Sequence, residues 1–148
     1  MAIFVKRVRS ERELHDAYKV RTEVFVEEQK VPPEEEIDQF EDQCIHFVAY
    51  DEGEPVGAGR LRTVESTGKV ERICVAKSHR GTGLGKQIMK HIEKEAHEQD
   101  FSILKLNAQT HAEEFYRKLG YETDSGEFLD AGIPHVAMKK RLNTETAV

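Results

Sequence analysis

The sequence predicts a mixed α/β domain built around one central sheet. Three observations support this prediction: strand-like and helix-like segments both occur, three strand-like segments follow one another through short turns, and no repeat or low-complexity linker divides the chain. Consecutive strands do not fit the strict strand–helix alternation of a Rossmann fold. With 148 residues, we expect one domain covering residues 1–148.

Each expected strand is a short apolar or alternating run next to turn residues. These strands are 3–8, 44–51, 56–64, 69–76, 102–108, 121–130 and 133–142. The first helix begins at Ser10, because Ser10 and Glu13 form a capping-box pattern. Its apolar spacing continues to Val26, and two prolines in the acidic loop 31–42 stop it.

Two further helices are expected in the second half of the chain. Apolar residues recur every three or four positions over 84–98, which indicates an amphipathic helix. Thr110 and Glu113 form a second capping-box pattern, and the helix that they open ends at Gly120, a residue that favours a left-handed stop.

Composition argues against several classes of protein. A net charge of −6 is unusual for a nucleic-acid-binding protein. No apolar run approaches the roughly 20 residues that span a bilayer. The first segment, "AIFVKRVRS", is too short and too charged for a signal peptide. We therefore expect a cytoplasmic protein without nucleic-acid or membrane partners. Cys44 and Cys74 show no metal-ligand spacing and no HExxH motif occurs, so no metal is expected and both cysteines are interpreted as buried.

The segment "RGTGLGK" lies between an expected strand and an expected helix. Free amide groups, glycines and two cations there would form a cradle for a pyrophosphate. Its residues are Arg80, Gly81, Thr82, Gly83, Leu84, Gly85 and Lys86. A Walker loop fits poorly, because the glycine spacing is one residue short and Gln87 replaces the hydroxyl residue. A dinucleotide fingerprint also fits poorly, and a glycine-rich turn without a ligand is the remaining alternative.

The strand "VERICVA", the sequence "RGTGLG" and the amphipathic helix after them resemble motif A of the GNAT N-acetyltransferase superfamily. Its pattern Q/R-x-x-G-x-G/A is met by Arg80, Gly83 and Gly85. The segment "LNAQTHAEEFYRKLGYE" is similar to the next part of that family, and the first helix and "DAGIPHVAMKK" resemble the bacterial ElaA/YjcF-like subgroup. The resemblance implies a GNAT acyl-CoA N-acyltransferase fold: a mostly antiparallel sheet of about seven strands flanked by helices, splayed between strands 4 and 5.

The resemblance also implies that acetyl-coenzyme A (acetyl-CoA) donates an acetyl group directly to a primary amine. The pyrophosphate would bind the amides from Arg80 to Lys86. The pantetheine arm would pair with β-strand backbone at Ile73, Cys74 and Val75. Asn107 would hydrogen-bond the pantetheine or a water molecule, although it can equally be a turn residue. A non-catalytic acyl-CoA sensor and a protein-interaction module remain alternatives.

Two residues are expected to act in catalysis. Tyr116 matches the position of the family's proton donor, and a phenol is protonated at neutral pH; the alternative is a tyrosine that only packs beside the sheet. Glu71 is the candidate base, because strand alternation would place it on the same face as Ile73 and burial would raise its pKa. The alternative for Glu71 is an ion pair with Arg60, Arg62 or Arg72.

The acceptor is expected to be a small-molecule or peptide amine. Residues that resemble the subgroup's acceptor side are Arg21, Phe25, Glu28, Asp38, His111 and His135. A lone histidine on a strand is more often structural than functional. The acidic "PPEEEID" could attract a cationic amine, but a solvated charge run is the more common meaning of such a segment. The resemblance also allows a homodimer.

Overall fold

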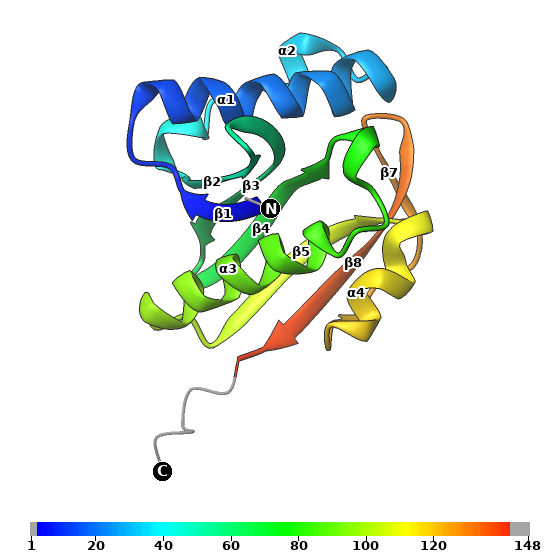
Figure 1. Ribbon diagram of the computed structural model, residues 1–148. Helices are drawn as coiled ribbons and strands as arrows, with labels where there is room; N and C mark the ends of the chain where they lie inside the picture. Colours follow the sequence, from blue (N-terminus) through cyan, green and yellow to red (C-terminus); the bar gives the residue numbers. More distant parts are fainter. Residues whose placement is uncertain (1–2, 143–148) are drawn as a thin grey trace.

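The computed structural model describes residues 3–142 and shows one large twisted sheet with helices on both faces (Figure 1). The strands are β1 (Ile3–Arg7), β2 (Ile45–Asp51), β3 (Glu54–Val64), β4 (Thr67–Val75), β5 (Ile103–Gln109), β6 (Glu122–Thr123), β7 (Phe128–Asp130) and β8 (Ile133–Arg141). The sheet has eight strands in the order β1-β2-β3-β4-β5-β8-β6, and β7 pairs with β8. The predicted mixed α/β fold is confirmed. Among these strands only β4 and β5 pair in parallel.

The helical segments connect these strands. They are α1 (Glu11–Arg21), the π-helical η1 (Thr22–Glu28), α2 (Pro33–Glu36), η2 (Glu41–Gln43), η3 (Lys77–His79), α3 (Leu84–Glu98), η4 (Thr110–Ala112) and α4 (Glu113–Lys118). In Figure 1, α1 and α2 lie on one side of the sheet, and α3 and α4 lie on the other. Helix α1 contacts β2, β3 and β4, whereas α4 contacts β5 and β6. In the part of the chain that the structure describes, no helix is both long and apolar enough to cross a membrane.

Helix α3 supplies the main apolar contact with the sheet. It buries Leu84, Ile88, Met89, Ile92 and Ala96, the stripe that the sequence periodicity predicts. The close approach depends on Gly59 of β3, since a Cβ atom there would lie 2.6 Å from Ile73 Cδ1 and 3.1 Å from Ile92 Cδ1. The second apolar cluster lies between α1 and the opposite face of the sheet.

The predicted capping signals have different outcomes. Ser10 caps α1, accepting a hydrogen bond from the Glu13 amide at 3.2 Å, as predicted. The second capping box is wrong: Thr110 starts a 3₁₀ turn, and α4 has no side-chain cap. Gly120 has φ of +100° just after α4, which confirms the predicted left-handed stop.

Two predictions need correction, the acidic loop 31–42 and the strand 121–130. The acidic segment 31–42 contains the short helix α2 and the start of η2, so it is more ordered than a loop. The segment 121–130 forms two short strands, β6 and β7, in place of one strand. The Asp124 amide still donates to the Ala137 carbonyl of β8, but the Ala137 amide donates to the Ser125 hydroxyl, so the backbone ladder is interrupted at Ser125.

The predicted splay lies between β4 and β5. Their parallel register runs only from Gly68↔Leu104 to Val70↔Leu106, so the rest of β4 has no partner on the β5 side. Just beyond this point β4 contains a bulge at Arg72, a non-glycine residue with φ of +60°. The β3 register shifts there, from Arg60↔Glu71 to Ala58↔Cys74, so β4 carries one extra residue.

Candidate functional site

The splay opens into a cleft of about 810 Å³. Its walls come from η1, β4, the glycine-rich loop, the start of α3, β5, α4 and the β7–β8 hairpin. The structure brings most of the predicted site residues to this cleft: Phe25, Glu28, Glu71, Ile73, Cys74, Val75, Arg80, Gly81, Gly83, Leu84, Gly85, Lys86, Asn107, His111, Tyr116 and His135. Thr82 does not line it, and its hydroxyl donates a hydrogen bond to the His79 carbonyl at 2.6 Å.

The glycine-rich loop leaves the beginning of α3 uncapped. Gly81 and Gly83 have φ of +78° and +86°, and a Cβ atom at either position would meet no other atom within 4 Å. Gly83 is the N-cap residue of α3 and makes no side-chain capping hydrogen bond. The first amide groups of α3 therefore face open space at the positive end of the helix dipole, an arrangement that suits an anion.

Arg80 and Glu28 bind each other across the cleft. The guanidinium donates to the two carboxylate oxygens at 2.5 and 2.6 Å, and its Nε donates to the Val75 carbonyl at 3.0 Å. The hydrogen bonds from Arg80 lower the pKa of Glu28. The next residue, Gln29, accepts a hydrogen bond from Gln109 of β5 at 2.9 Å. The end of η1 is thus attached to both diverging strands, through the loop after β4 and through β5.

Tyr116 lies on α4 and lines the cleft. The side chain is 9% exposed and contacts the rings of Phe115 and Tyr121 edge-on, at centroid distances of 5.0 and 6.0 Å. Burial raises the pKa of Tyr116 above its usual value, so the phenol is protonated at neutral pH. Its hydroxyl makes no hydrogen bond to another residue within 3–142, so it can donate to a ligand.

The geometry of Glu71 contradicts the reasoning that made it a candidate base. The bulge at Arg72 breaks strand alternation, so Glu71 faces Arg60 while Ile73 packs on the α3 side. Glu71 accepts hydrogen bonds from Arg60 Nε at 3.0 Å and Arg62 Nε at 2.9 Å. Burial by itself would raise the pKa of Glu71, but the hydrogen bond from Arg62 and the charge of Arg60 outweigh it, and the pKa is lowered.

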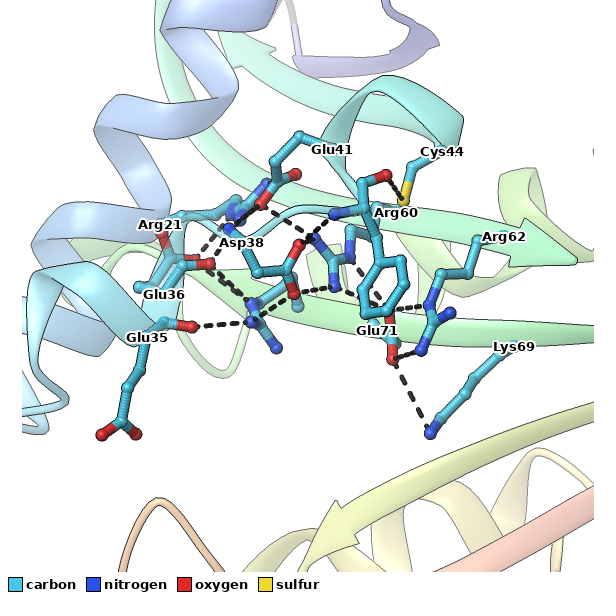
Figure 2. Close-up of polar contacts among 12 residues, drawn as sticks. Arg21, Glu35, Glu36, Asp38, Glu41, Cys44, Arg60, Arg62, Lys69 and Glu71 are labelled. Atoms are coloured by element: carbon cyan, nitrogen blue, oxygen red, sulfur yellow. Dashed lines mark hydrogen bonds and ion pairs between the residues drawn. The ribbon is translucent and has the colours of Figure 1, made fainter. Parts of the chain in front are cut away.

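Glu71 belongs to a network of buried ion pairs that attaches the acidic segment to β3 and β4 (Figure 2). Arg21, which is 1% exposed, donates to Glu36 at 2.7 Å and to Glu41 at 2.6 Å. Arg60, also 1% exposed, binds both carboxylate oxygens of Asp38 at 3.0 and 2.7 Å. The interpretation of "PPEEEID" as a solvated charge run is therefore wrong for Glu36 and Asp38.

This network also corrects the expected acceptor side. Arg21 and Asp38 do not line the cleft, because their charges are used within the network. Burial would raise the pKa of Asp38, but the hydrogen bonds from Arg60 and the Phe40 amide lower it to about 2. Arg72 donates to the backbone carbonyls of Glu35 and Glu36 at 3.2 and 3.1 Å, so it connects the bulge of β4 with α2.

A family model for the acetyltransferase (GNAT) domain matches residues 10–142. The chain belongs to the GNAT acetyltransferase family. It is 56% identical, over 133 residues, to the uncharacterized N-acetyltransferase YjcF of Bacillus subtilis, covering 89% of this chain and 95% of YjcF. A putative N-acetyltransferase from Lactobacillus plantarum has a similar structure, with a TM-score of 0.89 at 29% identity, covering 97% of this chain and 100% of that one. Escherichia coli ElaA matches with a TM-score of 0.83 at 25% identity, covering 95% of this chain and all of ElaA.

These findings confirm the predicted family and fold, and they make the protein an acyltransferase. In this GNAT acetyltransferase both predicted histidines line the cleft. His111 Nε2 lies 2.8 Å from Gln109 Oε1. His135, 8% exposed, stacks on Phe128, and its Nδ1 lies 2.6 Å from the Ile133 carbonyl oxygen. Because that carbonyl only accepts, Nδ1 carries a proton, and in the neutral ring Nε2 is then the acceptor.

Several residues of the cleft were not predicted from the sequence. They include Gln29, Lys69, His79, Gln109, Phe115 and Asp130. Gln109 could have been found by strand alternation, since it lies two residues after Asn107 on β5. Both cysteines are free thiols; Cys74 is buried as expected, which raises its pKa to about 12, whereas Cys44 is only partly buried, against expectation. Within residues 3–142, no three His, Cys, Asp or Glu side chains gather closely enough to hold a metal ion.

Proposed function

We propose that this protein is an N-acetyltransferase that binds acetyl-CoA in the splay between β4 and β5 and transfers the acetyl group directly to a primary amine. The observation that carries the proposal is the uncapped start of α3, which opens on the cleft behind two left-handed glycines. This arrangement provides several amide donors and a helix dipole to a diphosphate without any protein group that must first be displaced. Lys86, in the first turn of α3, adds a positive charge.

The pantetheine arm is proposed to lie along the part of β4 that has no β5 partner. Pairing stops at Val70, so the backbone at Ile73 and Val75 is available on that side and lines the cleft. An extended amide chain can add to such an edge through backbone hydrogen bonds that do not depend on side chains. Cys74 would contribute only its backbone, because its buried thiol has a pKa raised to about 12 and stays protonated at neutral pH.

For the chemistry, we assign three tasks to residues of the cleft. A backbone amide of β4 would polarise the thioester carbonyl. Tyr116 would donate its proton to the departing thiolate of CoA, since its phenol is protonated and its hydroxyl is not bound by another described residue. His135 Nε2 would accept the proton that the amine loses, because the Ile133 carbonyl fixes the required tautomer. Glu71 is not assigned as the base, since its ion pairs lower its pKa.

The proposal is tested by two measurements on the purified protein. Calorimetry should show binding of acetyl-CoA, and assay of free thiol should show amine-dependent release of CoA from acetyl-CoA. Absence of CoA binding would refute the proposed site and the proposed function together. Binding without thiol release for any primary amine would leave an acyl-CoA-binding protein and refute the transferase assignment.

A further inference from the structure

Beside the cleft, the sheet carries a row of cations. Residues that pair directly across neighbouring strands are Arg62↔Lys69 between β3 and β4, Lys69↔Lys105 between β4 and β5, and Lys105↔Lys139 between β5 and β8. Directly paired residues point to the same face of a sheet, with Cβ atoms about 5 Å apart. Four cations from four strands therefore lie in one line on one face.

The row begins where the buried ion-pair network ends. The network contains four carboxylates and four guanidinium groups, those of Glu36, Asp38, Glu41, Glu71, Arg21, Arg60, Arg62 and Arg72. Lys69 adds a fifth cation, 3.7 Å from a Glu71 carboxylate that two arginines already bind. Figure 2 shows Lys69 at the edge of this group, with its ammonium joined only to Glu71 among the residues drawn. The excess positive charge therefore lies at Lys69, and Lys69 lines the cleft.

The far end of the row is balanced by carboxylates, whereas its centre is not. Lys139 lies opposite Glu122 of β6 in the sheet, and its ammonium lies 3.6 Å from the Asp124 carboxylate. Lys105 is exposed, and within residues 3–142 it forms no ion pair. Like charges placed opposite each other destabilise a sheet. In a chain with a net charge of −6, the unbalanced pair Lys69–Lys105 marks a local positive field next to the cleft.

We propose that Lys69 and Lys105 bind an anionic group of the acceptor, so that the acceptor is a primary amine that also carries a carboxylate or a phosphate. This inference rests on the proposed function and adds the class of the acceptor. Lys105 and Asn107 lie on the same face of β5, two residues or about 7 Å apart, and Asn107 lines the cleft. The anionic group would therefore bind a short distance from the reacting amine, which fits small zwitterions.

Two other occupants fit this face less well. A polycationic amine would be repelled by Lys69 and Lys105. A second copy of the chain, placed on the same row by a twofold axis, would bring the two rows of cations together, because a twofold contact uses the same patch on both subunits.

The test uses pairs of amines that differ only in the anionic group. β-Alanine is compared with β-alaninamide, and O-phosphoethanolamine with ethanolamine, by following free thiol release from acetyl-CoA. We expect kcat/KM to be at least about tenfold higher for the anionic member of one pair, mainly through KM, which is the effect of one charge-assisted contact. The pair that shows the preference distinguishes a carboxylate from a phosphate.

Variants then locate the contact. In Lys69→Gln and Lys105→Gln, the preference for the anionic member should fall by about five- to tenfold, and it should disappear in the double variant. Lys94→Gln, which removes the same charge from an exposed position on α3, should keep the wild-type preference. Circular dichroism and CoA titration show whether each variant is folded and binds its co-substrate.

Three outcomes are decisive. Equal kcat/KM within both pairs, in a protein that binds CoA and acetylates amines, overturns the inference and leaves the proposed function standing. A preference that survives in the double variant also overturns it. If none of the four amines reacts, the same pairs are titrated calorimetrically into the CoA complex, and equal or absent binding within both pairs again overturns the inference.

Discussion

Replacement of Gly83 by alanine tests the proposed diphosphate site most directly. Gly83 has φ of +86°, and its added Cβ would meet no protein atom within 4 Å. The cost to the folded protein is therefore only that of holding alanine in the left-handed region, about 1 kcal/mol. For a domain of this size, that corresponds to a fall in Tm of about 3 °C. In the complex, however, the methyl group would occupy the open space in front of α3 that is proposed for the diphosphate.

Gly53 provides a matched control, because it has φ of +87°, has no atom within 4 Å of its added Cβ, and lies in the turn between β2 and β3. We expect Gly83→Ala and Gly53→Ala to lose similar stability in thermal unfolding. Only Gly83→Ala should lose affinity for CoA, by at least about tenfold or about 1.4 kcal/mol, in calorimetric titration. Equal CoA affinities in these two variants would refute the argument that this loop binds the diphosphate.

Three further predictions concern Tyr116, Asp38 and Gly59. Tyr116→Phe should lower kcat roughly 100-fold. Because burial raises the Tyr116 pKa, deprotonation of Tyr116 should not lower the wild-type rate between pH 7 and 9. A fall in rate over this range that disappears in Tyr116→Phe would contradict this role. The pKa of Asp38 is lowered to about 2 from 3.8, so its contribution of about 2 kcal/mol is complete at pH 7 and is lost as the pH falls from about 4 to 2. Asp38→Asn should therefore destabilise the protein about twice as much at pH 7 as at pH 3 in denaturant unfolding, and equal losses would contradict the assignment. Gly59→Ala would place a Cβ 2.6 Å from Ile73 Cδ1 and should lower the free energy of unfolding by about 1–3 kcal/mol. Ile73→Val removes that methyl group, so adding it to Gly59→Ala should restore part of this free energy in the same assay. Strictly additive effects in the double variant would argue against this contact.

Much of the fold could be predicted because it depends on local periodicity. The apolar spacing of 84–98 predicts α3 with the bounds that are observed, Leu84–Glu98. The glycine-rich loop could also be predicted, since a left-handed backbone favours glycine and two of its glycines have positive φ. These features depend on residues close together in the chain, and their residue types indicate the backbone conformation directly.

The buried ion pairs could not be predicted in the same way. Asp38 and Arg60 are 22 positions apart, and the carbonyl of Glu36 binds Arg72, 36 positions further along the chain. A pattern of consecutive acidic residues has no periodicity that shows which of them is buried. Burial of Glu36 and Asp38 requires arginines from α1, β3 and β4 at the same place, which only the tertiary fold provides.

The bulge at Arg72 explains why Glu71 does not share a face with Ile73, although Glu71, Ile73 and Val75 all line the cleft. Arginine has no preference for positive φ, so the residue type gives no signal of an irregular strand. The conformation is held by contacts of the Arg72 side chain with the carbonyls of Glu35 and Glu36. One extra residue therefore has two consequences. It turns Glu71 toward the arginines, where it serves the ion-pair network, and it restores Ile73 to the α3 side, where the unpaired part of β4 lines the cleft.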